Sequence, residues 1–347
     1  MKLAQTGLEG VEVAETRLSL VDGERGTLLV CGRRLAELSD LTQEQMAELM
    51  WQRPANFGPD RLKAYHCLRP LFGVLAGSEP QQAVRLGLAA LPTGSSPAFV
   101  AASLPVILAG AKQGENLAEP DPSLDPVADF LRLFRGQQPD FQETKALATY
   151  FVTVAEHGMN ASTFCCRVAA STRATALESI LAAYCALCGP LHGGAPGPVL
   201  DLLDELRESQ DKEAVLAEKV RAGERLMGFG HRVYKTRDPR AQVLQRAVGL
   251  LTPSSTLKEA EETEELAQRV LQELKPGRAL FTNVEFYTAV LLNELGFERQ
   301  WFTPLFATGR VVGWVAHFEE QVQTGRLMRP KARYVGLPLQ TPEGCPG

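Results

Sequence analysis

Residues 227–241 read Met-Gly-Phe-Gly-His-Arg-Val-Tyr-Lys-Thr-Arg-Asp-Pro-Arg-Ala, and this stretch decides how the chain is interpreted. It places two glycines, a histidine and four cationic side chains within thirteen residues. Glycine allows a ligand to approach the backbone closely, and guanidinium groups bind anions through paired N–H donors. The stretch lacks the glycine and lysine spacing of phosphate-binding loops and of dinucleotide-binding folds, so it predicts an anion site of another kind.

Two more histidines lie beside glycines. They occur in Glu156-His157-Gly158 and in Leu191-His192-Gly193-Gly194, and the whole chain has only 5 histidines. A single histidine of this kind is most often structural, but three such settings in one chain favour a shared functional site.

Composition and charge are those of a folded globular protein. The chain has 347 residues, of which 45% are hydrophobic and 22% charged, and its net charge is −5. Nucleic-acid-binding domains usually carry a net positive charge, so the negative charge of this chain predicts no nucleic-acid partner. The first ten residues contain no apolar core of a secretory signal, and the 7 cysteines are an odd number scattered along the chain. Both features favour reduced thiols and a cytoplasmic location.

The pattern along the chain is mainly α-helical. Two apolar stretches within residues 16–30 flank Asp22-Gly23, which predicts a small N-terminal β-hairpin. Beyond it Leu, Ala, Glu, Gln and Arg recur with helical spacing, and Thr42 followed by Gln45 is a capping box. The uncharged run 86–111 is long enough to cross a membrane, but its three prolines and neighbouring serines indicate helix, turn and helix.

Cys185-Ala-Leu-Cys188 followed by His192 resembles half of a zinc site. A closed zinc site needs four ligands, and the other cysteine pair, Cys165-Cys166, is adjacent rather than spaced. Small helical thiols are therefore the favoured interpretation, and no metal is expected. No Gly-x-Ser-x-Gly motif is present, so serine-hydrolase chemistry has no support.

The three histidine segments resemble those of the citrate synthase family. The matching stretches are Gly-Pro-Leu-His-Gly-Gly-Ala at 189–195, the segment 227–241, and His-Gly-Met-Asn-Ala-Ser-Thr at 157–163. The likeness continues in the family's order through residues 7–11, 22–26, 119–123, 302–306 and 329–331. Because it spans nearly the whole chain, the protein is identified as a member of that family.

The resemblance implies a fold and an activity. The fold is the all-helical citrate synthase architecture, with a large domain of residues 1–192 and 285–347 and a smaller inserted domain of residues 193–284. The active site would lie in the cleft between them. The activity is a Claisen condensation of acetyl-CoA with oxaloacetate, followed by hydrolysis of the thioester to citrate and CoA. No metal or cofactor is implied beyond the coenzyme A thioester, which enters as a substrate.

The resemblance also implies residue roles. His192 donates a hydrogen bond to the enol(ate) oxygen, His231 polarises the ketone of oxaloacetate, and Glu285 is the base. Ser162 orients His192. The residues implied to bind oxaloacetate are His157, Asn160, Arg240, Asn283, Arg310 and Arg329, and those implied to contact coenzyme A are Gly228, Phe229, Gly230 and Lys235. The family further implies a homodimer in which Arg329 reaches across the interface, with no membrane association.

The sequence departs from the family pattern at the base. Where the family has aspartate, residues 283–287 read Asn-Val-Glu-Phe-Tyr. Further departures are Ala289 and the Ala195-Pro196-Gly197 stretch. Two alternatives therefore stay open. One is 2-methylcitrate synthesis from propionyl-CoA; the other is a catalytically weakened protein that binds the same ligands as a regulatory or partner subunit.

Overall fold

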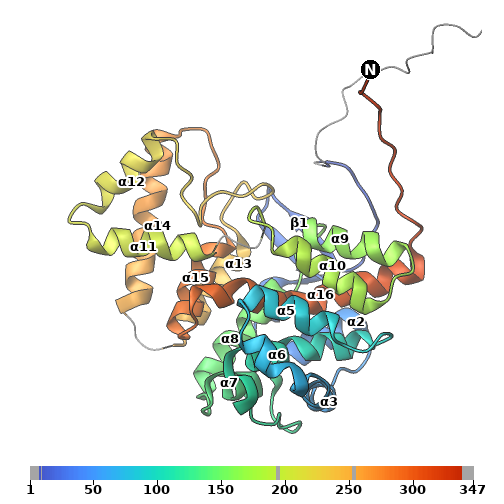
Figure 1. Cartoon of the computed structure of the whole chain (residues 1–347). Coiled ribbons are helices and arrows are strands. Elements are labelled where there is room, and N and C mark those ends of the chain that lie inside the picture. Colours follow the sequence, from blue (N-terminus) through green and yellow to red (C-terminus); the bar gives the residue numbers. More distant parts are fainter. Residues whose placement is uncertain (1–7, 9, 193–195, 252–254, 338–347) are drawn as a thin grey trace, which may run out of the picture.

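Helices dominate the computed structural model of the chain, as the sequence predicts (Figure 1). The structure describes residue 8 and residues 10–192, 196–251 and 255–337. The elements of the first half are β1 (Ser19–Asp22), β2 (Thr27–Val30), β3 (Arg33–Arg34), α1 (Leu35–Leu38), α2 (Gln43–Trp51), α3 (Gly58–Leu68), η1 (Arg69–Leu71), α4 (Phe72–Ala76), α5 (Pro80–Ala89), α6 (Pro97–Gln113), η2 (Gly114–Asn116), α7 (Pro126–Arg135) and α8 (Phe141–Val154). The second half contributes α9 (Ala161–Ser171), α10 (Ala176–Leu187), α11 (Pro196–Glu208), α12 (Lys212–Arg221), α13 (Pro239–Val248), α14 (Ser255–Leu274), α15 (Val284–Glu294), η3 (Arg299–Trp301) and α16 (Phe302–Thr324).

The predicted N-terminal hairpin is confirmed and is part of a small antiparallel sheet in the order β1-β2-β3. Ser19 pairs with Val30 and Asp22 with Thr27. The Asp22 carboxylate accepts the backbone N–H groups of Glu24 and Arg25, which closes the turn. The third strand is only two residues long and has no alternation of its own, so the sequence pattern did not predict it.

Helix starts follow their sequence signals. Thr42 and Gln45 form the capping box that opens α2. The long uncharged run divides into α5 and α6, with Pro97 in the first turn of α6 and every residue from Phe99 to Ala111 buried. The run is therefore helix, turn and helix, and its second helix, α6, lies in the core. No helix among the described residues has the length and apolar character needed to cross a bilayer.

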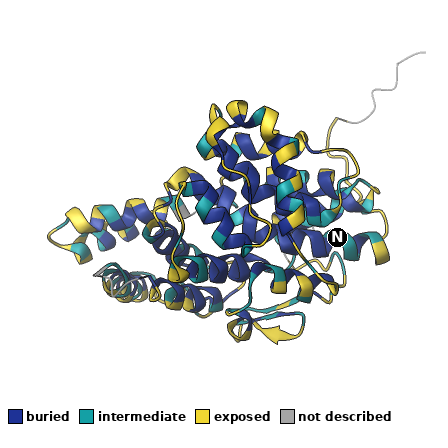
Figure 2. Cartoon of the chain, turned by 90° about the horizontal axis from the view of Figure 1, so that it is seen from below, coloured by how far each residue is buried: buried dark blue, intermediate teal, exposed yellow. Residues whose placement is uncertain are grey.

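Helix α16 runs through the middle of the structure and packs against α2, α6, α8, α9 and α10. Helices α11, α12 and α14 lie together to one side (Figure 1). Between the two groups, α13 packs on both α8 and α15. The buried faces of the helices point inward in both groups (Figure 2). The loops that precede α9, α13 and α15 therefore meet where the groups join.

Two glycines of α16 permit its close approach to the end of α8. A Cβ on Gly309 would lie 2.9 Å from the Cα of Phe151, and one on Gly313 would lie 2.1 Å from the carbonyl oxygen of Ala155. Real Cβ atoms do not approach backbone atoms so closely, so only glycine fits at these positions. This contact places the chain that follows α8, where Glu156 and His157 lie.

We expect Gly313→Ala to lower the free energy of unfolding by about 1–3 kcal/mol, because overpacking must push α16 away from Ala155. Denaturant unfolding followed by circular dichroism measures this. Gly73→Ala is the matched control, since the added Cβ there meets only the Glu115 side chain, at 3.3 Å. That control should be neutral or stabilising by up to about 1 kcal/mol, as alanine is the better helix former. Equal destabilisation by both variants would contradict the interpretation.

Candidate active site

His231 lies in a loop held by the segment that precedes α15. Gly228 and Gly230 both have positive φ, at 88° and 85°. The Asn283 side chain donates to the carbonyl of Gly230, and its backbone N–H donates to the carbonyl of Gly228. The His231 Nδ1 atom accepts the N–H groups of Val233 and Tyr234, each at 3.0 Å. The neutral ring therefore carries its hydrogen on Nε2, as a donor for a ligand.

Arg240 is anchored next to His231 by a buried carboxylate. Asp238 caps α13 and accepts bonds from the Arg240 backbone N–H, Nε and Nη2, the last at 2.7 Å. The Asp238 side chain is completely buried. Nη2 of Arg240 lies 3.4 Å from Nε2 of His231. Burial, and after it the charge of Arg240, lowers the pKa of His231 to about 4, so the ring is neutral at pH 7.

His157 faces the same point from the loop after α8. Its Nε2 atom lies 3.1 Å from the Tyr234 hydroxyl, and its ring centroid lies 5.4 Å from that of His231. Tyr234 also packs its ring on His231, with centroids 4.7 Å apart. Burial, followed by the nearby charge of Arg240, lowers the pKa of His157 well below its ordinary value. A second neutral imidazole thus lies beside the first.

His192 follows α10 and is oriented by the start of α9. Its Nε2 atom accepts the Ser162 N–H at 3.3 Å and lies 2.9 Å from Ser162 Oγ. Ser162 Oγ also lies 2.8 Å from the Asn160 side-chain oxygen and accepts the Trp314 indole N–H at 3.3 Å. Burial, and then the charge of Arg310, lowers the pKa of His192 to about 4. The hydrogen of the neutral ring is consequently on Nδ1.

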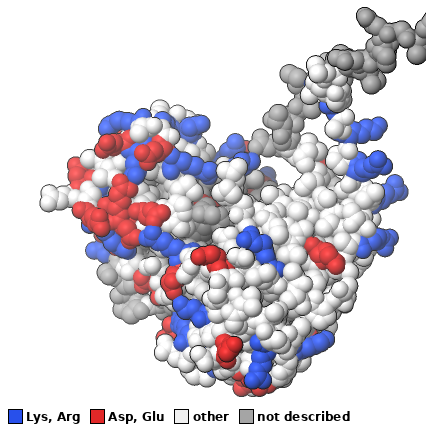
Figure 3. Space-filling view, viewed as in Figure 1, with Lys and Arg blue, Asp and Glu red and all other residues white. Residues whose placement is uncertain are grey.

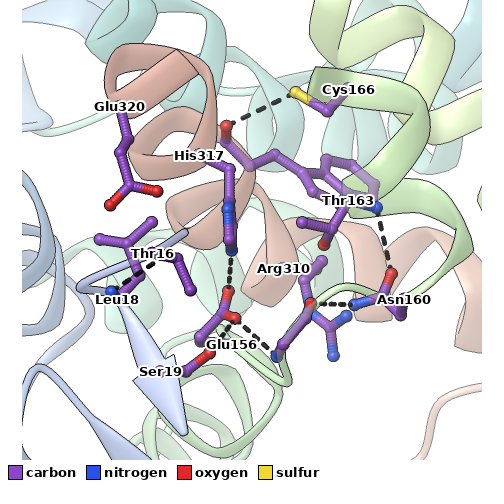
Figure 4. Close-up of polar contacts among 12 residues, drawn as sticks. Thr16, Leu18, Ser19, Glu156, Asn160, Thr163, Cys166, Arg310, His317 and Glu320 are labelled. Carbon is purple, nitrogen blue, oxygen red and sulfur yellow. Dashed lines mark hydrogen bonds and ion pairs between the residues drawn. The ribbon is translucent and has the colours of Figure 1, made fainter. Parts of the chain in front are cut away.

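Arg310 is buried on α16 and shares this charge environment (Figure 4). Its Nε donates to the carbonyl of Val154, and its guanidinium lies 4.7 Å from the Phe306 ring centroid. Burial lowers the pKa of Arg310 to about 10, although the nearby Glu156 opposes the shift. The group stays charged at pH 7 and is available to bind a carboxylate.

Glu156 holds the turn that carries His157 through hydrogen bonds to its neighbours. Its Oε1 accepts Ser19 Oγ at 2.7 Å and the Gly158 N–H at 2.6 Å, and its Oε2 lies 3.1 Å from His317 Nε2 (Figure 4). Burial raises the pKa of Glu156, but the facing His317 and Arg310 outweigh burial and hold that pKa below its ordinary value. The carboxylate therefore fixes the turn next to His157.

Glu285 lies in the first turn of α15, which Asn283 caps. Its Oε2 atom is buried and has no hydrogen-bond partner among the described residues. Burial raises the pKa of Glu285, while the charges of Arg225 and Arg240 oppose the rise. A half-buried carboxylate with one buried, unpartnered oxygen and a raised pKa suits a general base.

A cavity of about 550 Å³ adjoins His231. Phe229, Gly230 and Lys235 line it, as three of the four predicted coenzyme A contacts. Its apolar lining includes Leu226, Leu271 and Leu280. Five cationic side chains surround it: Arg225, Arg232, Lys235, Lys275 and Arg278. The cavity offers a basic rim over an apolar wall.

The structure brings most predicted residues to one place, since His157, His192, His231, Arg240, Arg310 and Glu285 are linked by the contacts and charge interactions described above. Arg329 is different. It is exposed in the segment after α16, which leaves the helical body in Figure 1, and it makes no contact with the other candidates within this single chain. The departure at Ala195 lies outside the described residues, whereas Pro196 and Gly197 begin α11.

Sequence reasoning missed Tyr234, Asp238 and Glu156 as parts of the site. Asp238-Pro239 carried a usable signal, because aspartate before proline is typical of a helix start. Tyr234 and Glu156 carried none beyond their position next to a histidine segment. Among the described residues, no three His, Cys, Asp or Glu side chains are grouped to hold a metal ion.

Known proteins have the same helical fold, and the sequence of this chain matches theirs. Residues 7–331 match the family model described as "Citrate synthase, C-terminal domain". The chain belongs to the citrate synthase family. Citrate synthase of Haloferax volcanii is 32% identical over 366 residues, which cover 95% of each chain. "Putative citrate synthase 2" of Mycobacterium bovis is 43% identical over 221 residues, and the match spans 64% of this chain and 59% of that relative.

Solved structures of citrate synthases have the same fold as this chain. The crystal structure of citrate synthase from Thermotoga maritima superposes with a TM-score of 0.84 at 32% identity, covering 99% of this chain and 98% of that one. The ternary complex of carboxymethyl coenzyme A and oxaloacetate with citrate synthase from Thermoplasma acidophilum gives a TM-score of 0.82 at 26% identity, with 96% of each chain covered.

We expect nitrogen-15 NMR of histidine-labelled protein at pH 6 to show His192 and His231 as neutral rings. His192 should be in the Nδ1–H form and His231 in the Nε2–H form, and both should titrate near pH 4. The urea-unfolded chain is the control, since its histidines should titrate at about pH 6.5. Between about pH 6.5 and 4 the histidines of the unfolded chain bind protons and the folded rings do not. The free energy of unfolding should therefore fall as the pH drops from about 6.5 toward 4. Imidazolium signals from either ring in the folded protein at pH 6 would overturn the assignment.

Proposed function

We propose that the protein condenses acetyl-CoA with oxaloacetate and hydrolyses the thioester to give citrate and CoA. One observation carries the proposal: neutral imidazoles, buried arginines and a carboxylate with an unpartnered oxygen lie close together beside a basic cavity. Claisen chemistry needs a base for a weakly acidic methyl group and donors for the oxygens that gain charge. The site offers each of these groups.

In this mechanism Glu285 removes a proton from the acetyl methyl group, and His192 donates its Nδ1–H to the enol(ate) oxygen. His231 donates its Nε2–H to the ketone oxygen of oxaloacetate while the new carbon–carbon bond forms. Water then hydrolyses the thioester bond, which releases citrate and the CoA thiol. Neutral imidazoles suit both donor roles, because each has one ring N–H that can donate a hydrogen bond to a developing oxyanion.

Arg240 and Arg310 bind the two carboxylates of oxaloacetate in this proposal, with His157 and Asn160 beside them. Both guanidinium groups are buried, and Asp238 balances only that of Arg240. Oxaloacetate therefore binds first and draws residues 193–284 onto the remainder of the chain, which completes the acyl-CoA site. The basic rim of the cavity suits the phosphates of coenzyme A, and its apolar wall suits the adenine ring and the pantetheine arm.

The proposal includes a homodimer in which Arg329 completes the partner's site. The face formed by α5, α9 and α10 supports it, because Figure 3 shows few charged side chains there. Leu86 of α5 and Cys185 of α10 are both exposed, as expected of helices that a second copy covers. The cysteines within the described residues are unpaired, which fits the cytoplasmic location proposed here.

The test of function is release of free thiol from acetyl-, propionyl- and butyryl-CoA in the presence of oxaloacetate. We expect acetyl-CoA to be used, and preference for propionyl-CoA would instead favour 2-methylcitrate synthesis. Glu285→Gln should lower turnover at least about a hundredfold, because the amide cannot accept the methyl proton. Glu285→Asp should also lower turnover, since it withdraws the carboxylate by roughly 1 Å.

Oxaloacetate binding measured by calorimetry is the control for both variants and should stay within about threefold of the unmodified protein. Turnover by Glu285→Gln at the unmodified rate would show that this carboxylate is not the base. Absence of thiol release with all three esters would favour a binding or regulatory role.

Shared active sites predict complementation between inactive variants. Arg329→Ala chains mixed with His231→Ala chains should recover up to about a quarter of unmodified activity, because half of the dimers are mixed and each mixed dimer has one intact site. The mixture is assayed after subunit exchange, which mass spectrometry of isotope-labelled chains verifies. No recovery after confirmed exchange would refute the crossing of Arg329.

A further inference from the structure

The β1–β2 hairpin touches both loops that carry the substrate histidines. At its base, Ser19 Oγ donates to Glu156 Oε1 at 2.7 Å (Figure 4). Val21 packs closely on Gly158. A Cβ added to Gly158 would lie 3.1 Å from the Cγ2 methyl carbon of Val21. The base of the hairpin therefore rests on the residues that flank His157.

The tip of the hairpin rests on the other loop. The Gly23 carbonyl accepts the Lys235 backbone N–H at 2.9 Å. A Cβ on Gly23 would lie 2.1 Å from the Val233 carbonyl oxygen, and one on Gly26 would lie 2.3 Å from Thr236 Oγ1. The tip of the hairpin therefore packs directly on residues 233–236, and a side chain at either glycine would clash with them. In Figure 1, β1 lies between the group of α11, α12 and α14 and the main helical body.

The tip contact acts directly on the hydrogen bonds of His231. The Val233 carbonyl that faces Gly23 and the Tyr234 N–H that donates to His231 Nδ1 belong to one peptide unit. A peptide unit is planar and stiff, so a push on its oxygen moves its N–H group as well. The same displacement moves the Tyr234 side chain, whose hydroxyl lies 3.1 Å from His157 Nε2.

We propose that the β1–β2 hairpin is a positioning element of the active site: its base holds the His157 loop, and its tip presses on the 233–234 peptide that fixes the ring orientation and tautomer of His231. The inference rests on the proposed function for its kinetic consequence. Its structural content concerns His231 itself and is measured without turnover.

The test uses Gly23→Ala in the full-length protein. Gly23 has no positive φ, so alanine fits its backbone and only the contact with Val233 changes. We expect a fall in kcat of at least tenfold and a nitrogen-15 His231 signal that loses the pattern of an unprotonated, amide-bonded Nδ1. The midpoint of thermal unfolding should stay close to that of the control.

Gly32→Ala is the control, because Gly32 lies in the β2–β3 turn of the same sheet, has φ of 79° and has nothing within 4 Å of an added Cβ. It strains the sheet without touching residues 233–236. Gly26→Ala is the second test and supplies the result where Gly23→Ala does not fold. Gly26 has φ of 60°, so its backbone strain is matched by Gly32→Ala, and only Gly26→Ala meets Thr236.

A His231 spectrum like that of the unmodified protein, together with kcat within twofold of Gly32→Ala, would overturn the positioning role. A fall in kcat and in thermal stability that Gly32→Ala reproduces would overturn it as well, since both would then reflect a weakened sheet. If the unmodified protein releases no thiol from any acyl-CoA, the proposed function fails, and the His231 spectra of the same variants still decide the role of the hairpin.

Discussion

The completely buried carboxylate of Asp238 is the constraint on which the site depends. A buried charge is tolerated only when it is paired and its oxygens are hydrogen-bonded. Asp238 meets this requirement with the Arg240 backbone, the Arg240 guanidinium and the Val284 N–H. These donors come from the first turns of α13 and α15, so one side chain fixes two helix starts relative to each other. It thereby sets where the proposed ketone donor His231 and the proposed base Glu285 lie.

Charge and hydrogen-bonding direction are divided between two kinds of side chain. Arg240 and Arg310 supply positive charge, and burial, reinforced by that charge, keeps His157, His192 and His231 neutral. A neutral imidazole has one donor and one acceptor, so an N–H group or hydroxyl of the protein at one nitrogen decides which nitrogen faces the ligand. The arginines thus attract an anion, while the histidines direct their hydrogen bonds at particular atoms of it.

The sequence predicted the helical class, the N-terminal hairpin and the capping box of α2, because each depends on neighbours within a few residues. It did not predict the support beneath the site. Ser19 and Glu156 are 137 residues apart in the chain, and no local pattern links them. Tyr234 lies within the histidine motif, but the motif alone predicts no role for it, because only the fold brings its hydroxyl to His157. The role of Arg329 stays a prediction, because a single chain does not contain the surface it is proposed to reach.

The Trp314 indole, fully buried in α16, donates its N–H to the same Ser162 hydroxyl that contacts His192. The energy of an indole's excited state responds to the electric field and the hydrogen bond at its ring nitrogen. The protein therefore carries its own optical probe one side chain away from a proposed catalytic imidazole. We expect a ligand that changes the charge or the bonding of His192 to alter the emission of Trp314, one of the chain's 3 tryptophans, through the serine.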